Sequence, residues 1–407
     1  MEIFSSIIQH SFVKFIIAKC SHAMNLSDYN QIPSPAFVLD LKRFTSNLNL
    51  LKEIQEKAGI NIILALKGFS LWHVFPLIKK YLSGATASSF HEALLIFNEM
   101  GTKAHTYSPA YIPTDFDKVV QYSSHITFNS CAEYIRYLPF ISSKNPLFSP
   151  GIRVNPGYSP VDVALYNPAA EGSRLGVTVD RIKELNQLPN LEGLHIHTLC
   201  ESDSYHLEKL IDAVILNFGE LLPKLKWINF GGGHLMTKSN YDVPHLISVL
   251  QSFKLKYPNL SVILEPGSAV VWETGELVST VLDIVDNNGI KTAILDVSFT
   301  AHMPDTLEMP YRPNILNASR ELNLDFHNAY RLGGVSCLAG DFLEEYFFSS
   351  PLQVGQKLIF LDMMHYTMVK TTMFNGVGHP EIGCWSEDDG YKLWKKFDYS
   401  DFKNRLG

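Results

Sequence analysis

The sequence is poor in the features that build disulfide frameworks and zinc sites. Its 407 residues include five cysteines, which are scattered, odd in number and never arranged as CxxC. This usage is typical of a reducing cytosol and argues against a disulfide framework or a structural zinc site. The motifs HExxH, GxSxG and the Walker loop are also absent, so none of those three signatures can explain the chemistry of the protein.

Basic runs and long apolar runs are missing as well. The net charge is -7 and no Lys/Arg run stands out, which disfavours binding to nucleic acid or to an anionic membrane. Residues 3–18 are mostly apolar, but they are too short and too polar for a spanning helix and lack the basic start of a signal peptide. We expect residues 1–30 to be an N-terminal extension, in which 1–23 come from an early start codon or form a loosely attached helix.

What the chain does have is enough apolar sequence for a large core. Hydrophobic residues make up 46% and charged residues 18% of the chain, as in globular proteins, and the length suits about two or three domains. Residues 36–40 predict a short strand introduced by two prolines. Apolar residues at helical spacing predict an amphipathic helix over 41–58.

From there a strand, turn and helix pattern repeats. Eight such units favour a TIM (β/α)8 barrel of α/β class over an open doubly wound sheet, and they place an active site at the C-terminal strand ends. The eight predicted strand ends are 65–67, 85–88, 105–108, 126–129, 152–155, 194–197, 228–231 and 262–265.

After Pro266 the pattern changes to a mostly β domain. Residues 276–286 and 291–297, joined by Asn287-Asn288-Gly289, predict a β-hairpin, and residues 356–362 predict a further strand. We therefore expect a barrel over 41–266 and a discontinuous β domain made of 31–40 and 267–407.

Three strand ends carry residues with chemical potential. Lys67 is either a lysine that snorkels to solvent or a partly desolvated amine able to form a Schiff base. Gly231, Gly232 and Gly233 form either a plain turn or a backbone cradle for phosphate. Glu265 is either a solvated acid or a carboxylate that keeps a ring nitrogen protonated.

The remaining candidates are less specific when taken singly. His195 and His197 alternate on one strand face, which usually means core packing and sometimes a metal pair, but no further metal ligands are evident and we expect no metal. Cys337 and Asp341 share one loop, and Asp305 and Glu308 share a proline-pinned loop that either binds an ammonium group or faces water. Tyr366 follows a strand and could donate to a phosphate.

Taken together and in order, these residues resemble the fold-type III pyridoxal-phosphate decarboxylases, which have an alanine-racemase-like barrel. Within that group the similarity is greatest to carboxynorspermidine/carboxyspermidine decarboxylases. The segments that carry the resemblance are Ala65-Leu-Lys67-Gly-Phe, 86–89 with Glu92, 193–201, 302–313, Ser336-Cys-Leu-Ala-Gly-Asp341 and 362–370.

The resemblance implies a role for each residue. Lys67 would hold pyridoxal 5'-phosphate through a Schiff base, His197 would stack on its ring, and Glu265 would pair with the ring nitrogen and contribute to substrate binding. Gly231, Gly232, Gly233 and Tyr366 would hold the phosphate. Cys337 and Asp341 would reach into the site of a partner subunit in a homodimer, with Cys337 as the proton donor. Asp305, Glu308 and Asp341 would bind the ammonium groups of a polyamine.

Three positions depart from the pattern of the group. Relatives have aspartate at the position of Thr86, arginine at that of Ser268 and, in several cases, a phosphate-binding serine at that of Cys200. The implied activity is a cytoplasmic carboxy-lyase of polyamine and spermidine biosynthesis. Alternatives are a diaminopimelate or ornithine decarboxylase, and a non-catalytic homologue that binds cofactor or partners.

Overall fold

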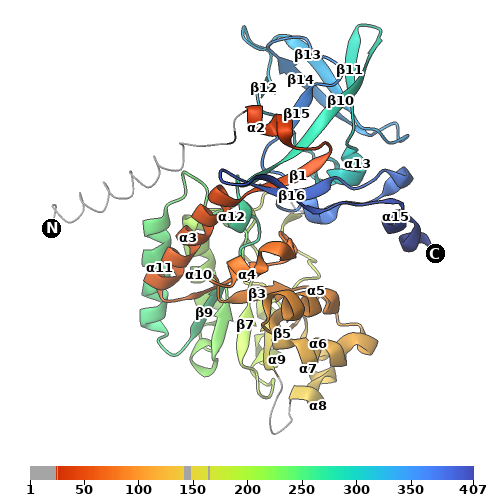
Figure 1. The fold of residues 1–407 in the computed structure, drawn as a ribbon. Coiled ribbons are helices and arrows are strands. Elements are labelled where there is room, and N and C mark those ends of the chain that lie inside the picture. The colour runs from red at the N-terminus through yellow and green to blue at the C-terminus, as the bar shows by residue number, and fades with distance from the viewer. Residues whose placement is uncertain (1–23, 25, 142–147, 164–165) are drawn as a thin grey trace, which may run out of the picture. The chain divides into compact units, whose positions relative to one another are not determined.

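The computed structural model describes residues 24, 26–141, 148–163 and 166–407, and its chain divides into two compact units (Figure 1). The barrel unit is Asn47–Val270, and the β unit combines Met1–Ser46 with Val271–Gly407. Both boundaries lie a few residues beyond the predicted ones, after residues 40 and 266. The first boundary lies beyond residue 40 because Arg43 is bonded to Asp40 and Glu276 of the β unit.

The barrel unit contains a closed barrel of eight parallel strands, as predicted. All eight predicted strand ends coincide with the end of an observed strand or lie within a few residues of it. The strands, in the order in which they pair, are β2 (Asn61–Ala65), β3 (Gly84–Ala87), β4 (Ala104–Tyr107), β5 (Ser123–Phe128), β6 (Ser149–Arg153), β7 (Gly193–His195), β8 (Trp227–Asn229) and β9 (Ser261–Leu264).

The strand register brings polar residues to one level of the barrel. Arg153 of β6 pairs with His195 of β7, and His195 pairs in turn with Asn229 of β8. Each of these side chains is less than 5% exposed. Three neighbouring strands therefore present polar groups side by side at the C-terminal end, where barrel enzymes have their sites.

Helices follow the strands and cover the barrel from outside. In Figure 1, α10 (Ser204–Phe218) and α11 (Val243–Lys256) lie side by side on its outer face. The predicted helix 41–58 is confirmed as α3 (Leu41–Ala58). The other helices of this part of the chain are α4 (Phe75–Ile78), α5 (Phe90–Leu95), α6 (Phe116–Tyr122), α7 (Cys131–Arg136), α8 (Leu138–Ile141), α9 (Ile182–Leu185) and α12 (Ser268–Val271).

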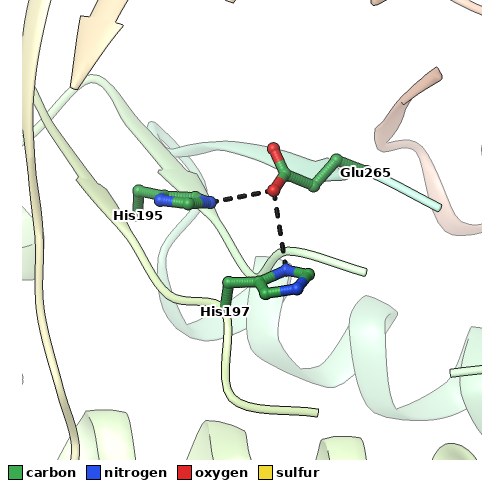
Figure 2. Close-up of side chains that lie close together, drawn as sticks. All are labelled: His195, His197 and Glu265. Carbon is green, nitrogen blue, oxygen red and sulfur yellow. Dashed lines mark hydrogen bonds and ion pairs between the residues drawn. The ribbon is translucent and has the colours of Figure 1, made fainter. Parts of the chain in front are cut away.

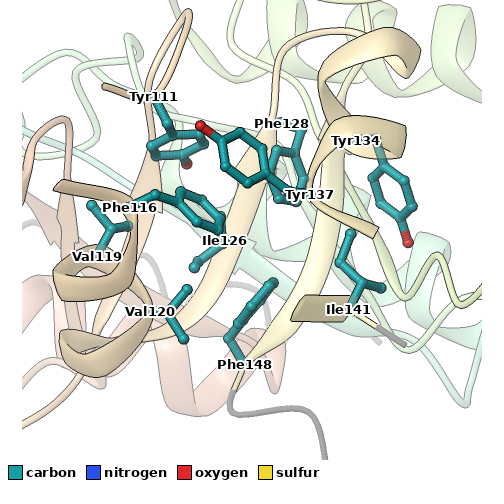
Figure 3. Packing of buried hydrophobic residues seen from close by; sticks show 10 residues of the cluster. All are labelled: Tyr111, Phe116, Val119, Val120, Ile126, Phe128, Tyr134, Tyr137, Ile141 and Phe148. Carbon is teal, nitrogen blue, oxygen red and sulfur yellow. The ribbon is translucent and has the colours of Figure 1, made fainter. Parts of the chain in front are cut away.

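An aromatic cluster fixes α6, α7 and α8 to strand β5. Figure 3 shows Phe116 of α6 stacked on Tyr137, with ring centroids 3.8 Å apart, and Phe128 of β5 packed beside them. All of these side chains are buried. Aromatic contacts of this kind add to the burial energy, so this side of the barrel is rigidly packed.

The β unit is a nine-stranded mixed sheet, and it contains the predicted hairpin. Asn288 and Gly289 have positive φ values of 55° and 82°, as a two-residue hairpin turn requires. The strand order is β12 (Ala318–Ser319), β14 (Phe342–Phe348), β13 (Asn328–Gly333), β11 (Ile290–Leu295), β10 (Gly275–Asn287), β1 (Ala36–Asp40), β16 (Glu381–Ser386) and β17 (Gly390–Lys395), with β15 (Lys357–Phe360) paired to β10.

The predicted extension over residues 1–30 is only partly described. Residues 1–23 and 25 lie outside the described residues. Met24 and Tyr29, which lies in α2 (Leu26–Gln31), are buried against Val38 and Val278 of the β unit. Met24 and Tyr29 are therefore packed in the β unit, and the extent of an N-terminal extension stays a prediction. Across the described ranges, we find no helix with the length and apolar character needed to cross a membrane.

Candidate active site

A cavity of about 270 Å³ opens at the C-terminal ends of the barrel strands. Its wall includes three of the predicted site residues, Lys67, His197 and Glu265, together with Thr86 at the end of β3. The barrel fold thus gathers residues that are up to about two hundred positions apart in the sequence. The remaining lining residues are Ala65, Leu66, Ser88, Tyr107, Pro109, Arg153, Arg174 and His195.

Lys67 follows β2 and turns its amine into this cavity. Its Nζ lies 2.8 Å from Nε2 of His197. The side chain is accessible through the cavity, but the surrounding protein removes much of its hydration, and this burial lowers the pKa of the amine from its ordinary value. A lowered pKa makes it easier to form the uncharged amine, and the uncharged amine is the form that can attack a carbonyl carbon.

His197 contacts the Lys67 amine through one ring nitrogen and the glycine loop through the other. The backbone N–H of Gly232 donates to Nδ1 of His197 over 3.1 Å. Burial, together with the charge of Lys67, holds the pKa of His197 well below its ordinary value, which favours the neutral ring. The ring is thus held beside the Lys67 amine.

Glu265, directly after β9, is a buried carboxylate that the rings of His195 and His197 approach (Figure 2). His195 Nε2 donates to Oε1 over 2.9 Å, and Asn229 Nδ2 donates to Oε2 over 2.9 Å. Burial alone would raise the pKa of Glu265, but the contacts with His195, His197 and Lys67 hold that pKa well below the ordinary range. The site therefore presents a negative charge in its wall.

The glycine triplet after β8 is required by close packing. A Cβ at Gly233, where φ is +88°, would lie 1.9 Å from the carbonyl oxygen of Leu199, and one at Gly231 would lie 2.4 Å from that of Ile196. Gly231 and Gly232 already donate their N–H groups to Asn229 and His197. The triplet is thus a backbone loop pressed against the strand ends, where no side chain would fit.

Arg153 is a site residue that was not singled out in the sequence. Its Nη2 donates to the carbonyl oxygen of His197 over 2.7 Å, and its guanidinium lies 4.8 Å from the ring centroid of Tyr107. The Tyr107 hydroxyl in turn donates to Asn129. The available signal was an arginine inside the apolar strand Ile152-Arg-Val, where an unpaired charge would be costly.

His195, His197 and Glu265 bring ligand-type atoms within 4.8 Å of one another. The hydrogen bond between His195 and Glu265 accounts for part of this proximity. The expectation that the site uses no metal stays a prediction.

Cys337 lies in the β unit, in the loop between β13 and β14. Its thiol side chain is exposed, and its backbone N–H donates to Asn375 Oδ1 over 3.0 Å. Asp341 of the same loop is 4% exposed and accepts hydrogen bonds from Thr300 N–H and from both the N–H and the hydroxyl of Ser336. Both carboxylate oxygens of Asp341 are therefore engaged in holding the loop.

The other predicted binding residues also lie in the β unit. Asp305 of α14 (Asp305–Glu308) accepts from the Tyr311 hydroxyl over 2.7 Å and from the Thr367 hydroxyl over 2.9 Å, both at Oδ2. Its buried Oδ1 accepts no hydrogen bond from any described residue. Glu308 is paired with Lys370. Which of these residues approach the Lys67 cavity stays a prediction, as does the role of Tyr366.

The fold and the site define a class of protein. A closed barrel with a lysine and a buried glutamate at its mouth, joined to a mostly β domain, is the architecture of the fold-type III pyridoxal-phosphate decarboxylases. A family model described as "Pyridoxal-dependent decarboxylase, C-terminal sheet domain" matches residues 36–364. The chain therefore belongs to the pyridoxal-dependent decarboxylase family, as the sequence predicted.

Individual relatives are similar to this chain in sequence over most of its length. The carboxyaminopropylagmatine decarboxylase of Synechocystis sp. is 49% identical over 391 residues, which cover 95% of this chain and 100% of the relative. The carboxynorspermidine/carboxyspermidine decarboxylase of Campylobacter jejuni is 39% identical, covering 93% and 99%. The crystal structure of carboxynorspermidine decarboxylase from Campylobacter jejuni, complexed with norspermidine, has a TM-score of 0.84 at 38% identity and covers 92% of this chain and 100% of that one.

Proposed function

We propose that the protein is a carboxy-lyase that converts carboxynorspermidine or carboxyspermidine to norspermidine or spermidine plus CO2, using pyridoxal 5'-phosphate in the Lys67 cavity. The observation that carries the proposal is that Lys67, whose amine has a pKa lowered by burial, and the buried carboxylate of Glu265 line one cavity. Relatives named for these substrates, at 39% and 34% identity, support the choice.

The residues of the cavity fit this cofactor. An amine of lowered pKa suits its aldehyde, and a buried anion suits its ring nitrogen. When bound, the cofactor withdraws electrons from the carbon that loses CO2. Lys67 would hold it covalently, Gly231, Gly232, Gly233 and Tyr366 would hold its phosphate, and His197 would cover one ring face.

Glu265 sets the electronic condition for the reaction. Its negative charge would keep the ring nitrogen protonated, because an opposite charge at close range favours the charged form. His195 and Asn229 supply neutral donors that leave this charge uncompensated. After CO2 leaves, Cys337 would return a proton to the reacting carbon, which requires it to enter the site from the partner subunit of a homodimer.

Among the acids predicted to bind ammonium groups, Asp305 has the best supported role. Its buried Oδ1 has no donor among the described residues, so it can accept one from a cation. Glu308 already has Lys370 as its partner, and the oxygens of Asp341 are occupied by its own loop. We expect Asp305 to contribute more to polyamine affinity than the other two. The scattered cysteines favour a cytoplasmic location.

A second candidate substrate is carboxyaminopropylagmatine. The relative named for it, at 49% identity, is more similar to this chain than the two named for the triamines. The substrates differ at the end remote from the reaction, where carboxyaminopropylagmatine has a guanidinium group in place of an ammonium group. A guanidinium presents a planar fork of donors and an ammonium a point charge, so one pocket seldom serves both equally well.

A competition assay tests the proposal. The purified protein with pyridoxal 5'-phosphate would receive carboxynorspermidine, carboxyspermidine and carboxyaminopropylagmatine together, and the decarboxylated products would be separated by mass. A higher kcat/KM for either triamine supports the proposal, and a higher kcat/KM for the guanidinium substrate replaces it with the second candidate. The two triamines differ by one methylene, which we expect to be worth about 1–3 kcal/mol.

Two further alternatives have their own signatures. A diaminopimelate or ornithine decarboxylase would release CO2 from those amino acids and not from the carboxylated polyamines. A non-catalytic homologue would release none from any of the substrates. Binding of pyridoxal 5'-phosphate that gives visible absorbance, lost in Lys67→Ala, would argue against a homologue that has lost its cofactor.

A further inference from the structure

Asn229, the last residue of β8, contacts both halves of the cofactor site. Its Nδ2 donates to Oε2 of Glu265 over 2.9 Å, and its Oδ1 accepts the backbone N–H of Gly231 over 2.8 Å. The side chain is 4% exposed, so water cannot readily replace either bond. One amide therefore joins the carboxylate proposed for the ring nitrogen to the loop proposed for the phosphate.

The chemistry of the partners fixes the orientation of this amide. A carboxylate oxygen can only accept, and a backbone N–H can only donate. Flipping the amide would oppose oxygen to oxygen and N–H to N–H, leaving two buried groups unsatisfied. Asparagine supplies one donor and one acceptor from a short side chain, whereas aspartate supplies acceptors alone unless it is protonated.

His195 offers a comparison within the same site. It donates to the other oxygen of Glu265, and no hydrogen bond joins its side chain to the glycine triplet among the described residues. The register places His195 directly beside Asn229 on the neighbouring strand. The two residues thus hold the same carboxylate from neighbouring strands, and Asn229 differs in being bonded to the loop as well.

We propose that Asn229 is a positioning residue that couples Glu265 to the glycine loop, so that the ring-nitrogen end and the phosphate end of the site hold one fixed geometry. The inference rests on the proposed function for the identity of the cofactor. The coupling itself is a property of the chain and is present without substrate.

The first test measures the loop in the full-length protein without cofactor. Hydrogen exchange of the peptide containing Gly231, Gly232 and Gly233 would be followed by mass spectrometry. Asn229→Ala removes the acceptor, and we expect exchange of the loop to accelerate by about two- to tenfold, the effect of one hydrogen bond. His195→Leu does not touch the loop and should exchange at the wild-type rate. Asn229→Asp keeps the acceptor, so at low pH, where it shares a proton with Glu265, its loop should also exchange at the wild-type rate.

The second test uses the charge of the Asn229→Asp side chain. At low pH this side chain and Glu265 share one proton, which restores a donor toward Glu265. As pH rises the proton is lost and two adjacent carboxylates repel each other. We expect the affinity for pyridoxal 5'-phosphate, measured by absorbance and compared with wild type at each pH, to fall by about ten- to a hundredfold as pH rises. His195→Leu should weaken binding without this pH dependence.

Either of two results overturns the coupling. One is wild-type exchange of the loop in Asn229→Ala, and the other is an Asn229→Asp protein whose cofactor affinity follows the wild-type pH profile. Should Asn229→Ala fail to fold, as judged by circular dichroism, the near-isosteric Asn229→Asp decides the question. The exchange measurement uses neither cofactor nor substrate. If Asn229→Ala alters exchange of the loop while the wild-type protein shows no decarboxylase activity, the proposed function is contradicted and the coupling stands.

Discussion

Two buried glutamates, one in each unit, show how the same side chain serves different purposes. Glu265 of the barrel is 6% exposed and Glu276 of the β unit is 1% exposed. Glu265 is held by the neutral donors His195 and Asn229. Glu276 instead forms an ion pair with Arg43, whose Nη2 lies 2.6 Å from it, and Arg43 also bonds Asp40.

The partners decide whether a buried charge remains available. In the β unit the guanidinium neutralises nearby carboxylates, and burial raises the pKa of Glu276 despite that ion pair. In the barrel the contacts of Glu265 lower its pKa and leave its charge facing a cavity. Breaking a buried ion pair destabilises a protein strongly, whereas removing an uncompensated charge at a cavity chiefly affects what the cavity binds. The barrel acid is thus suited to function and the β-unit acid to structure.

The largest expected effect comes from removing the amine that shares the cavity with Glu265. Lys67→Ala should lower the rate of CO2 release by roughly 10⁴-fold or more, because no other amine can take its place as nucleophile. The visible absorbance of bound cofactor should disappear with it. Steady-state kinetics and absorbance spectra measure both, and a variant that keeps even a tenth of the activity would contradict the assignment of Lys67.

The next largest effect is expected from removing Arg43, which forms ion pairs with Asp40 and Glu276. Arg43→Met leaves Asp40 and Glu276 buried without a cation, and we expect a loss of about 3–5 kcal/mol in the free energy of unfolding. Urea denaturation measures this loss. Lys42→Met is the matched control, because Lys42 pairs with Glu387 at an exposed site and should change stability by less than about 1 kcal/mol. Equal effects of the two variants would remove the distinction drawn between the glutamates.

The reciprocal substitution addresses the functional acid. Glu265→Gln removes the negative charge while keeping the size of the side chain, and we expect kcat per folded molecule to fall by roughly 10²–10³-fold, about 3–4 kcal/mol. The Gln N–H₂ group would face one of the donors His195 and Asn229, so the unfolding free energy should also fall by about 1–3 kcal/mol. Glu276→Gln should lower stability and leave kcat per folded molecule unchanged. The comparison fails if Glu265→Gln keeps the wild-type kcat per folded molecule.

The hydrogen bonds of Asp341 predict that this residue, like Glu276, stabilises the fold. Asp341→Asn replaces an acceptor with an N–H₂ group facing the donors of Ser336, and should destabilise the loop by about 1–3 kcal/mol. Hydrogen exchange of the peptide containing Ser336 and Cys337, followed by mass spectrometry, should accelerate as the loop opens. Glu344→Gln, at an exposed position of the same unit, serves as control. Unchanged exchange together with a raised KM for the substrate would favour direct substrate binding by Asp341.

The smallest expected effect is a pH dependence present in both units. Burial lowers the pKa of His234 in the barrel and of His302 in the β unit to about 4. Since the unfolded chain binds these protons near the ordinary value of about 6.5, acidification through this window favours unfolding. Between pH ~7 and ~5 each histidine should cost about 2 kcal/mol of stability. Denaturation of His234→Gln and His302→Gln at both pH values should show a shallower decline than wild type.

The strands and the hairpin could be predicted from the sequence, because local patterns carry that information. Short apolar runs ending in polar or small residues predicted the eight barrel strands, and they placed Lys67, His197 and Glu265 at strand ends that now line one cavity. The Asn-Gly turn predicted the hairpin of β10 and β11. Each of these signals lies within about ten consecutive residues, so no knowledge of the tertiary fold is required to read it.

The sequence does not reveal the role of a residue whose partners are distant in the chain. His195 read most simply as core packing, yet it donates to Glu265, which lies 70 positions away. Arg153 was overlooked because its partners Tyr107 and His197 come from other strands. The hydrogen bonds that Asp341 accepts from its own loop and from Thr300 were likewise not evident from the sequence, and its role in substrate binding stays a prediction.

The sequence by itself determined the barrel, the β sheet and the strand ends where reactive side chains stand, because backbone periodicity and turn chemistry are local properties. Only the tertiary structure decided which of those side chains keep a free charge or lone pair. Neutral donors surround Glu265, a guanidinium neutralises Glu276, and a hydrogen-bonded ring faces the amine of Lys67. In the barrel these outcomes follow from the register of neighbouring strands, since the register sets which donors and acceptors meet once the barrel closes. In the β unit the outcome follows from the meeting of Arg43 of α3 with Glu276 of β10.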